Sequence, residues 1–268
     1  MPTISAVGQS FALDGREACI QAIEIARQKI LHEADNIALA LVFASRDYNL
    51  QSILSGATAQ LRNTPLFGFS TEGQLTEGGH HQRSVVVALL AGSELSVQAN
   101  WWPDFSHDSR AKTLDMVAYL ELEKAENRAD SPGILLINTD GFQGENELLC
   151  KTLPSGGYSL LGGLTGGFDR QKLAFQIGGL TAGEHGMGAA FIQGNIKAGT
   201  GIAHGWQPIG KYFELSRTED FWIRKMDGRP ASETYAELFG QQAREWAFPP
   251  SIGWFAYIRL GWRIKGKS

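Results

Sequence analysis

Two loops of this chain carry the same combination of hydroxyl side chains and glycines. The stretch PLFGFSTEGQ and the later stretch SLLGGLTGGF align Gly68 with Gly162 and Thr71 with Thr165. Hydroxyl groups donate and accept hydrogen bonds, and the backbone N–H groups of glycine-rich turns bind anions. The pattern therefore predicts a site for a small polar ligand, although glycines at these positions also serve tight turns and close packing of the chain. The candidate ligand-binding residues are Ser70, Thr71, Gly73, Thr165, Gly166 and Gly167, joined by His204 and Trp206 from a later glycine-rich segment.

Three further stretches approach known catalytic or nucleotide-binding motifs without completing them. GWQPIGK has the spacing of a phosphate-binding loop, but Tyr212 stands where a magnesium-binding Ser or Thr is needed and no helix pattern follows. GTGIAHG differs from the dinucleotide fingerprint by one residue, and GFSTEG is one residue too long for the serine-hydrolase motif. His80 and His81 are adjacent, so an extended backbone would point them to opposite faces. We expect these two histidines on a surface loop, with no metal bound.

Composition excludes several classes of partner. The formal net charge is −4 and the basic residues are scattered, which argues against nucleic acid. No long apolar run or signal segment occurs, so neither a membrane span nor export is predicted. Cys19 and Cys150 fall in helical patterns outside any CxxC pair, and we predict buried free thiols in a reducing compartment. These features indicate a cytoplasmic protein.

One supersecondary unit is predicted to occur twice. An amphipathic helix over residues 16–34 precedes an apolar strand over 36–45 and a helix near 48–61, for which Asp47 is the expected cap. The strands PLFGFS, SVVVALLAG and ELSVQANWW follow, the last two joined by a turn at Gly92-Ser93.

After a helix in the segment SRAKTLDMVAYLELEKAEN the same order returns as GILLINTDG, a helix near 145–153, SLLGGLTGG and GMGAAFIQG. The expected register places Leu41 on Leu135 and Ser45 on Thr139. The predicted fold class is α/β (α+β mixed), an internally duplicated domain with mixed β-sheets and flanking helices.

The ordered set of these strands and loops, with GIAHGWQPIG and MDGRPASETYAELFG, resembles the N-terminal FIST domain. The resemblance implies a cytoplasmic, ligand-sensing module of bacterial and eukaryotic signalling proteins, not an enzyme. It further implies an amino-acid-like ligand and a separate signalling partner such as a histidine kinase, a cyclic-dinucleotide enzyme or a chemoreceptor. Some similar proteins bind haem and respond to nitric oxide, which makes His204 a candidate axial ligand.

The resemblance also suggests the domain organisation. We expect an N-terminal helix over residues 1–35 and the FIST N-terminal-like domain over 36–239, with half-repeats at about 36–100 and 133–195. Residues 240–268 read poorly as the C-terminal FIST domain that usually follows, and we interpret them as a truncated or aberrant remnant; an added edge strand is the alternative. A small-molecule metabolic enzyme and a non-functional remnant stay open as other interpretations of the whole chain.

Overall fold

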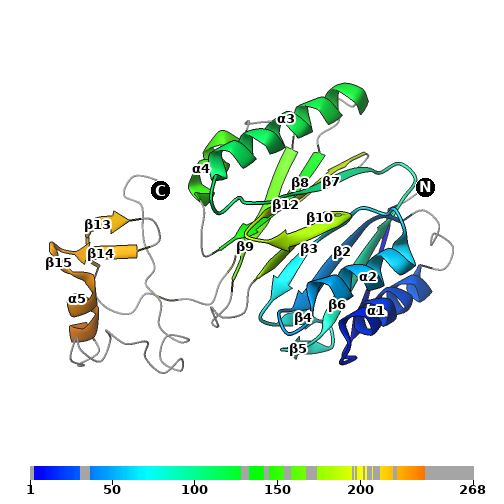
Figure 1. Cartoon of the computed structure of the whole chain (residues 1–268), viewed down its shortest axis with the longest axis horizontal. Helices are drawn as coiled ribbons and strands as arrows, with labels where there is room; N and C mark the ends of the chain where they lie inside the picture. Colours follow the sequence, from blue (N-terminus) through cyan, green and yellow to red (C-terminus); the bar gives the residue numbers. More distant parts are fainter. Residues whose placement is uncertain are drawn as a thin grey trace. The chain divides into compact units, whose positions relative to one another are not determined.

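The computed structural model describes residues 3–30, 37–127, 133–141, 145–153, 158–166, 174–194, 196, 198–201, 203, 207, 212–219 and 222–238. The chain divides into two compact units, residues 1–200 and 201–268. The first unit contains both sheets of the repeated fold (Figure 1). None of the described helices is long and apolar enough to cross a membrane.

The elements of the first unit follow one another in two similar series. The first series is β1 (Ile4–Ser10), α1 (Gly15–Lys29), β2 (Ile37–Ser45), α2 (Leu50–Leu61), β3 (Leu66–Thr71), β4 (Gln74–Thr76), β5 (Gly79–His81) and β6 (Val85–Ala91). The second series is β7 (Ser96–Trp102), α3 (Ser109–Asn127), β8 (Gly133–Asp140), α4 (Asn146–Thr152), β9 (Tyr158–Thr165), β10 (Phe175–Gly179), β11 (Thr181–Glu184) and β12 (Met187–Gln193). The predicted mixed α/β class is confirmed.

The two larger sheets repeat one topology. One has the strand order β1-β6-β2-β3-β10-β11, and the other has the order β7-β12-β8-β9. In both, the first two strands joined by a helix crossover are parallel (β2 with β3, β8 with β9), and the next long strand returns antiparallel (β6 on β2, β12 on β8). Because β1 pairs with β6 as β7 pairs with β12, the repeated unit begins with β1–α1 in the first half and with β7–α3 in the second. The predicted boundaries are therefore wrong: residues 1–35 contain β1 as well as a helix, and β7, most of which was assigned to the first half-repeat, belongs to the second.

The expected register is wrong by one residue between β2 and β8. Leu41 packs in the cluster between the two sheets, as Leu136 does, whereas Leu135 faces the helices of the second half. Leu41 is therefore the equivalent of Leu136. The sequence offset that relates β2 to β8 differs from the one that relates β3 to β9. Ser45 pairs with Thr71 in the first half, whereas Asp140, and not Thr139, pairs with Thr165 in the second. The equivalence of Thr71 and Thr165 is consistent with this pairing.

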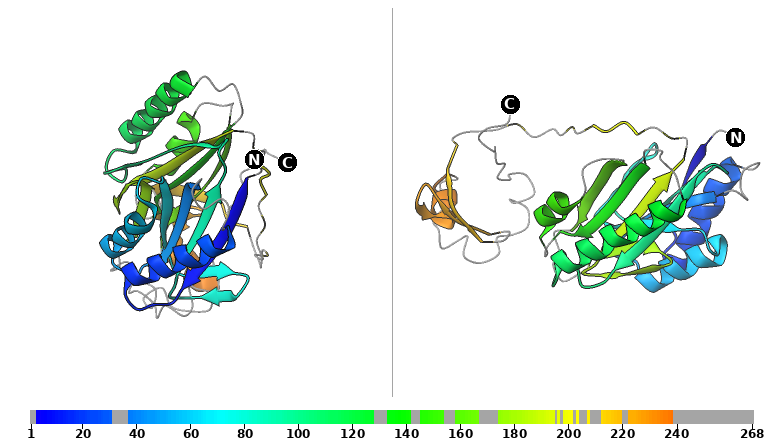
Figure 2. Two further views of the ribbon diagram at one scale, coloured as in Figure 1. Left: turned by 90° about the vertical axis from the view of Figure 1, so that its right-hand side faces the viewer. Right: turned by 90° about the horizontal axis from the view of Figure 1, so that it is seen from above.

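Three apolar clusters hold these layers together. One cluster lies between the first sheet and helices α1 and α2, a second lies between the other sheet and α3 and α4, and the third lies between the sheets. The result is four layers, helices–sheet–sheet–helices, which can be followed in the left view of Figure 2. Helix α1 begins where the Asp14 carboxylate accepts the Glu17 N–H at 2.9 Å, and it buries Cys19 against the sheet.

Other local predictions are corrected or confirmed. The cap of α2 is Asn49, which accepts the Ser52 N–H at 3.1 Å, so the cap predicted at Asp47 is wrong. Cys150 is exposed rather than buried, because it lies on the outer face of the short α4. Cys19 is buried as predicted, and burial raises the pKa of its thiol to about 12.

The strands on either side of Gly92 do not form a hairpin, because β6 and β7 belong to different sheets. This connection therefore carries the chain from the first sheet to the second.

The second unit contains a small antiparallel sheet and one described helix. Its elements are β13 (Leu215–Glu219), β14 (Trp222–Met226), β15 (Arg229–Pro230) and α5 (Ala231–Leu238). Asp227 and Gly228 both have positive φ, which fits the Asp-Gly turn predicted here. The tail interpreted as a remnant, residues 240–268, lies outside the described residues.

Candidate functional site

The carboxyl ends of the parallel strands carry the polar side chains of the first unit. In open α/β sheets, ligands bind beyond this edge, where loops and helix N-termini converge. Arg46 follows β2, and Asp140 ends β8.

Three of the predicted site residues use their polar groups inside the protein, and a fourth, Gly73, is required for close packing. Thr165 is 1% exposed; its hydroxyl donates to the Thr139 carbonyl at 3.0 Å and accepts from Gln176 Nε2 at 2.6 Å. Ser70, also 1% exposed, accepts the Phe175 N–H at 2.9 Å. Thr71 Oγ1 accepts from Gln74 Nε2 at 2.5 Å, and a side chain on Gly73 would collide with the His80 ring.

The structure brings part of the predicted set together. Ser70 and Thr165 contact the consecutive residues Phe175 and Gln176 at the start of β10, so these two hydroxyls lie near one another although they belong to different halves. Gly166 follows β9 and is half-buried. Gly167, His204, Trp206 and most of the motif GWQPIGK lie outside the described residues. The ligand-binding role of the predicted set stays a prediction.

Each half contains an equivalent hydrogen-bonded bridge made by a glutamine side chain. Gln74 and Gln176 each donate to the threonine that ends the preceding strand. Their side-chain oxygens accept from equivalent positions before the next strand, from the Ser84 hydroxyl at 2.8 Å and from the Gly186 N–H at 3.0 Å. These bridges join the loop to the following strand in each half, which is a structural use of the repeated hydroxyl and glycine pattern.

A histidine–carboxylate pair lies beside the bridge in the second half. His185 Nδ1 is 3.0 Å from Asp140 Oδ2, and the Ser106 hydroxyl donates to the same oxygen at 3.0 Å. Asp140 is buried, whereas 41% of the His185 side chain is exposed. Because Ser106 contacts the carboxylate rather than the imidazole, these three residues lack the hydroxyl-to-imidazole hydrogen bond of a serine-hydrolase triad.

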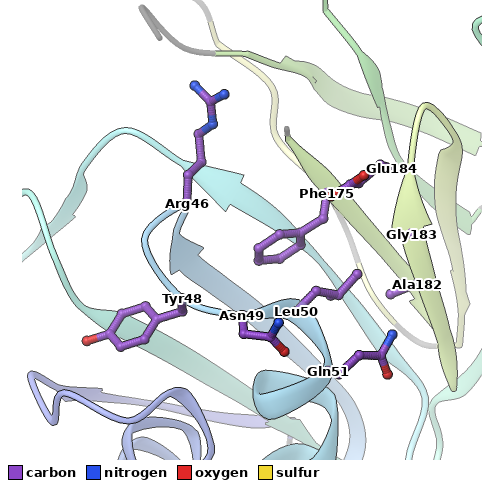
Figure 3. Close-up of a pocket in the computed structure, with 9 residues that line it drawn as sticks. All are labelled: Arg46, Tyr48, Asn49, Leu50, Gln51, Phe175, Ala182, Gly183 and Glu184. Carbon is purple, nitrogen blue, oxygen red and sulfur yellow. The ribbon is translucent and has the colours of Figure 1, made fainter. Parts of the chain in front are cut away.

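A pocket of about 480 Å³ lies at the carboxyl end of β2, against the hairpin of β10 and β11 (Figure 3). Its lining residues are Arg46, Tyr48, Asn49, Leu50, Gln51, Phe175, Ala182, Gly183 and Glu184. The volume falls within the range of small-molecule sites.

The pocket combines an apolar floor with charges of both signs. Phe175 is buried, and Leu50 and Ala182 pack with it in the first apolar cluster. In Figure 3 the Arg46 side chain extends away from Leu50 and Gln51, and this side chain is buried. The Arg46 guanidinium is 2.7 Å from Glu72, and Glu184 is exposed.

The N-terminus of α2 adds backbone polarity to the pocket. Asn49 caps the helix and lines the pocket, and the first turn contains no acidic side chain to offset the positive end of the helix dipole. Tyr48 is fixed beside it, because its hydroxyl donates to the Ala12 carbonyl at 2.8 Å and the Arg83 guanidinium lies over its ring. Burial raises the pKa of the Tyr48 phenol above its usual value.

None of the pocket residues belongs to the set predicted from sequence. The signal that was available is local: the polar run Arg46-Asp47-Tyr48-Asn49 stands between an apolar strand and a helix, where parallel sheets place ligands. The other wall has no such signal, since Glu184 reaches the pocket only because β11 lies in the first sheet.

Comparison with known proteins agrees with this architecture. The family model of the FIST N domain matches residues 38–229. The chain belongs to the FIST N domain family. FIST N domains are small-ligand sensory domains of signalling proteins, and the match runs from β2 through both halves of the duplicated fold into the second unit. No curated protein matches the chain.

Proposed function

We propose that this FIST N domain senses a small zwitterionic molecule of the amino-acid type, and that the pocket at the carboxyl end of β2 binds it. The observation that carries the proposal is that a basic residue, Arg46, and an acidic residue, Glu184, line one pocket together with the apolar Phe175 and Leu50. Arg46, with the N-terminus of α2, suits a carboxylate, and Glu184 suits an ammonium group. Phe175 suits an apolar side chain of the ligand.

Ligand binding would change the balance between two arrangements of the fold. The pocket is formed by the β2–α2 segment of one half and the β10–β11 hairpin of the other, so a ligand held between them favours the arrangement in which they are close. A separate output protein, such as a histidine kinase, a cyclic-dinucleotide enzyme or a chemoreceptor, would respond to that change.

Thermal-shift and calorimetric titration with the free amino acids test the proposal. A bound ligand at a hundredfold excess over its Kd should stabilise the protein by about 2.7 kcal/mol. Glu184→Gln removes the charge expected to meet the ammonium group and should weaken binding by about tenfold, equivalent to about 1.4 kcal/mol. Glu77→Gln is the matched control, because Glu77 is exposed in the β4–β5 turn and does not line the pocket. The proposal fails if no amino acid binds, or if both variants change affinity equally.

Haem-based sensing of nitric oxide is a second candidate, supported by the histidine–carboxylate pair. Asp140 holds Nδ1 of His185, which leaves Nε2 for a metal, and a carboxylate behind an imidazole is a common outer-shell partner of metal-bound histidine. Haem would supply the iron that binds nitric oxide, with His185 or His204 as axial ligand. Protein purified from haem-replete cells should show a Soret band, and the band should shift in His185→Ala or in His204→Ala but not in both. Absence of the band excludes this candidate without affecting the amino-acid proposal.

A further inference from the structure

The β4–β5 hairpin is the counterpart, in the first half, of the β10–β11 hairpin in the second. Each hairpin follows the strand that ends in Thr71 or Thr165. In each, a glutamine donates to that threonine: Gln74 is the first residue of β4, and Gln176 is the second residue of β10. Since Gln74 matches Gln176, Leu75 matches Ile177, the next residue along the chain.

Only one of these two hairpins has a partner in a larger sheet. β10 pairs antiparallel with β3, where Ile177 lies opposite Gly68 and is completely buried. Among the described strands β4 pairs with β5 alone, and Leu75 is 80% exposed. The first half therefore presents a leucine to solvent where the second half buries an isoleucine.

The strand that would receive β4 is also open. β9 ends the second sheet as the described strands are ordered, and it corresponds to β3. Gly162 corresponds to Gly68 both in position and in contact. A Cβ on Gly162 would collide with the carbonyl oxygen of its paired residue Ile137, and a Cβ on Gly68 would collide with that of its paired residue Val42. Gly68 is buried where β10 pairs with β3, whereas Gly162 is exposed.

β9 lacks the features that protect edge strands from pairing. Its eight residues, YSLLGGLT, contain no charge and no proline, and Leu160 and Leu164 are 38% and 55% exposed. Charged residues, prolines and bulges are the usual protection of such edges. This strand is therefore suited to strand addition, in which an extended segment forms main-chain hydrogen bonds along the edge.

We propose that β9 of one copy of this chain pairs antiparallel with β4 of a second copy, with Leu75 opposite Gly162 as Ile177 is opposite Gly68. We choose β4 of a second copy as the partner of β9 because the two pairs of strands are equivalent in the repeat. β4 is equivalent to β10, β9 is equivalent to β3, and β10 covers β3. Each copy carries both an open edge and an exposed hairpin, so a twofold dimer forms the contact twice and leaves neither unused.

Sedimentation and light scattering of the full chain, at low and high protein concentration, test this dimer. The unmodified chain should dimerise, and Leu75→Lys should raise the dimer dissociation constant at least about tenfold. Leu13→Lys is the matched control: Leu13 is 78% exposed but belongs to neither β4 nor β9, so this variant should dimerise normally. Both leucines are exposed, so neither substitution removes packing within the folded chain.

Hydrogen exchange locates the contact. Backbone amides of Tyr158–Thr165 should be protected at high concentration and should lose that protection in Leu75→Lys. A chain that stays monomeric at every concentration overturns the proposal. So does a dimer that resists Leu75→Lys, or one that forms without protecting β9.

Discussion

At the scale of single residues, two of the side chains that the sequence predicts as ligand contacts, Ser70 and Thr165, already have partners in the protein. The Thr165 hydroxyl has one donor and one acceptor partner, and the Ser70 hydroxyl accepts a main-chain N–H. Both are buried. An unsatisfied polar group in such surroundings is costly, so these hydroxyls stabilise the fold whatever else they contact.

Thr165→Val tests this structural use. Valine keeps the volume but removes both hydrogen bonds, which leaves the Gln176 amide and the Thr139 carbonyl each short of a partner. We expect the free energy of unfolding to fall by about 1–3 kcal/mol in denaturant titration. Thr165→Ser keeps the hydroxyl and should lose less. Equal stability of the valine variant and the original chain would contradict the structural role.

At the scale of elements, close contact between neighbouring strands depends on glycine. A Cβ on Gly68 would lie 1.9 Å from the Val42 carbonyl oxygen, and a Cβ on Gly162 would lie 2.3 Å from that of Ile137. Next to Gly162, a Cβ on Gly163 would meet no atom within 4 Å. Neighbouring glycines of one strand therefore have different roles.

Alanine substitution separates these roles. Gly68→Ala and Gly162→Ala force paired strands apart and should each cost about 1–3 kcal/mol or more. Gly163→Ala should be neutral or should stabilise by about 0.4–1 kcal/mol, since it restricts the unfolded chain without a clash. Chemical denaturation of the three variants checks the order. Similar losses at Gly162 and Gly163 would show that strand propensity, not close approach, governs β9.

The elements also show how far the sequence could predict this protein. Apolar runs ending in hydroxyl and glycine loops identify the repeated strand–helix–strand order, because both patterns are local. The register was missed because one fewer residue separates Asp140 from Thr165 than separates Ser45 from Thr71, so no single offset fits both strands. The pocket could not be predicted, since Glu184 lines it beside Arg46 only because β10–β11 inserts into the sheet of the other half.

At the scale of the whole first unit, a buried amide connects the two sheets. Asn138 on β8 is fully buried; it donates to the Gly68 carbonyl at 2.7 Å and accepts the Gly188 N–H at 3.2 Å. Gly68 belongs to one sheet and Asn138 to the other. A polar contact of this kind fixes how the layers are placed on one another, which an apolar interface alone does less specifically.

Asn138→Ala should therefore affect both sheets. We expect a loss of about 1–3 kcal/mol in the free energy of unfolding, because two buried groups lose their partner. Hydrogen exchange should accelerate in strands of both halves. Asn63→Ala, at an exposed position after α2, is the control and should change neither quantity. Faster exchange confined to β8 and β12 would show that Asn138 serves its own sheet only.

The insertion of β10 beside β3 has a consequence during synthesis on the ribosome. When β1 to β6 have emerged, the first sheet still lacks β10 and β11, and Leu39 and Phe67 lack the β12 side chains that later cover them. Pairing of Gly68 with Ile177 must wait for most of the second repeat, so the first repeat cannot complete its sheet as an early, independent intermediate. During that interval the nascent chain exposes an apolar sheet edge, which is the condition under which chaperones engage growing chains.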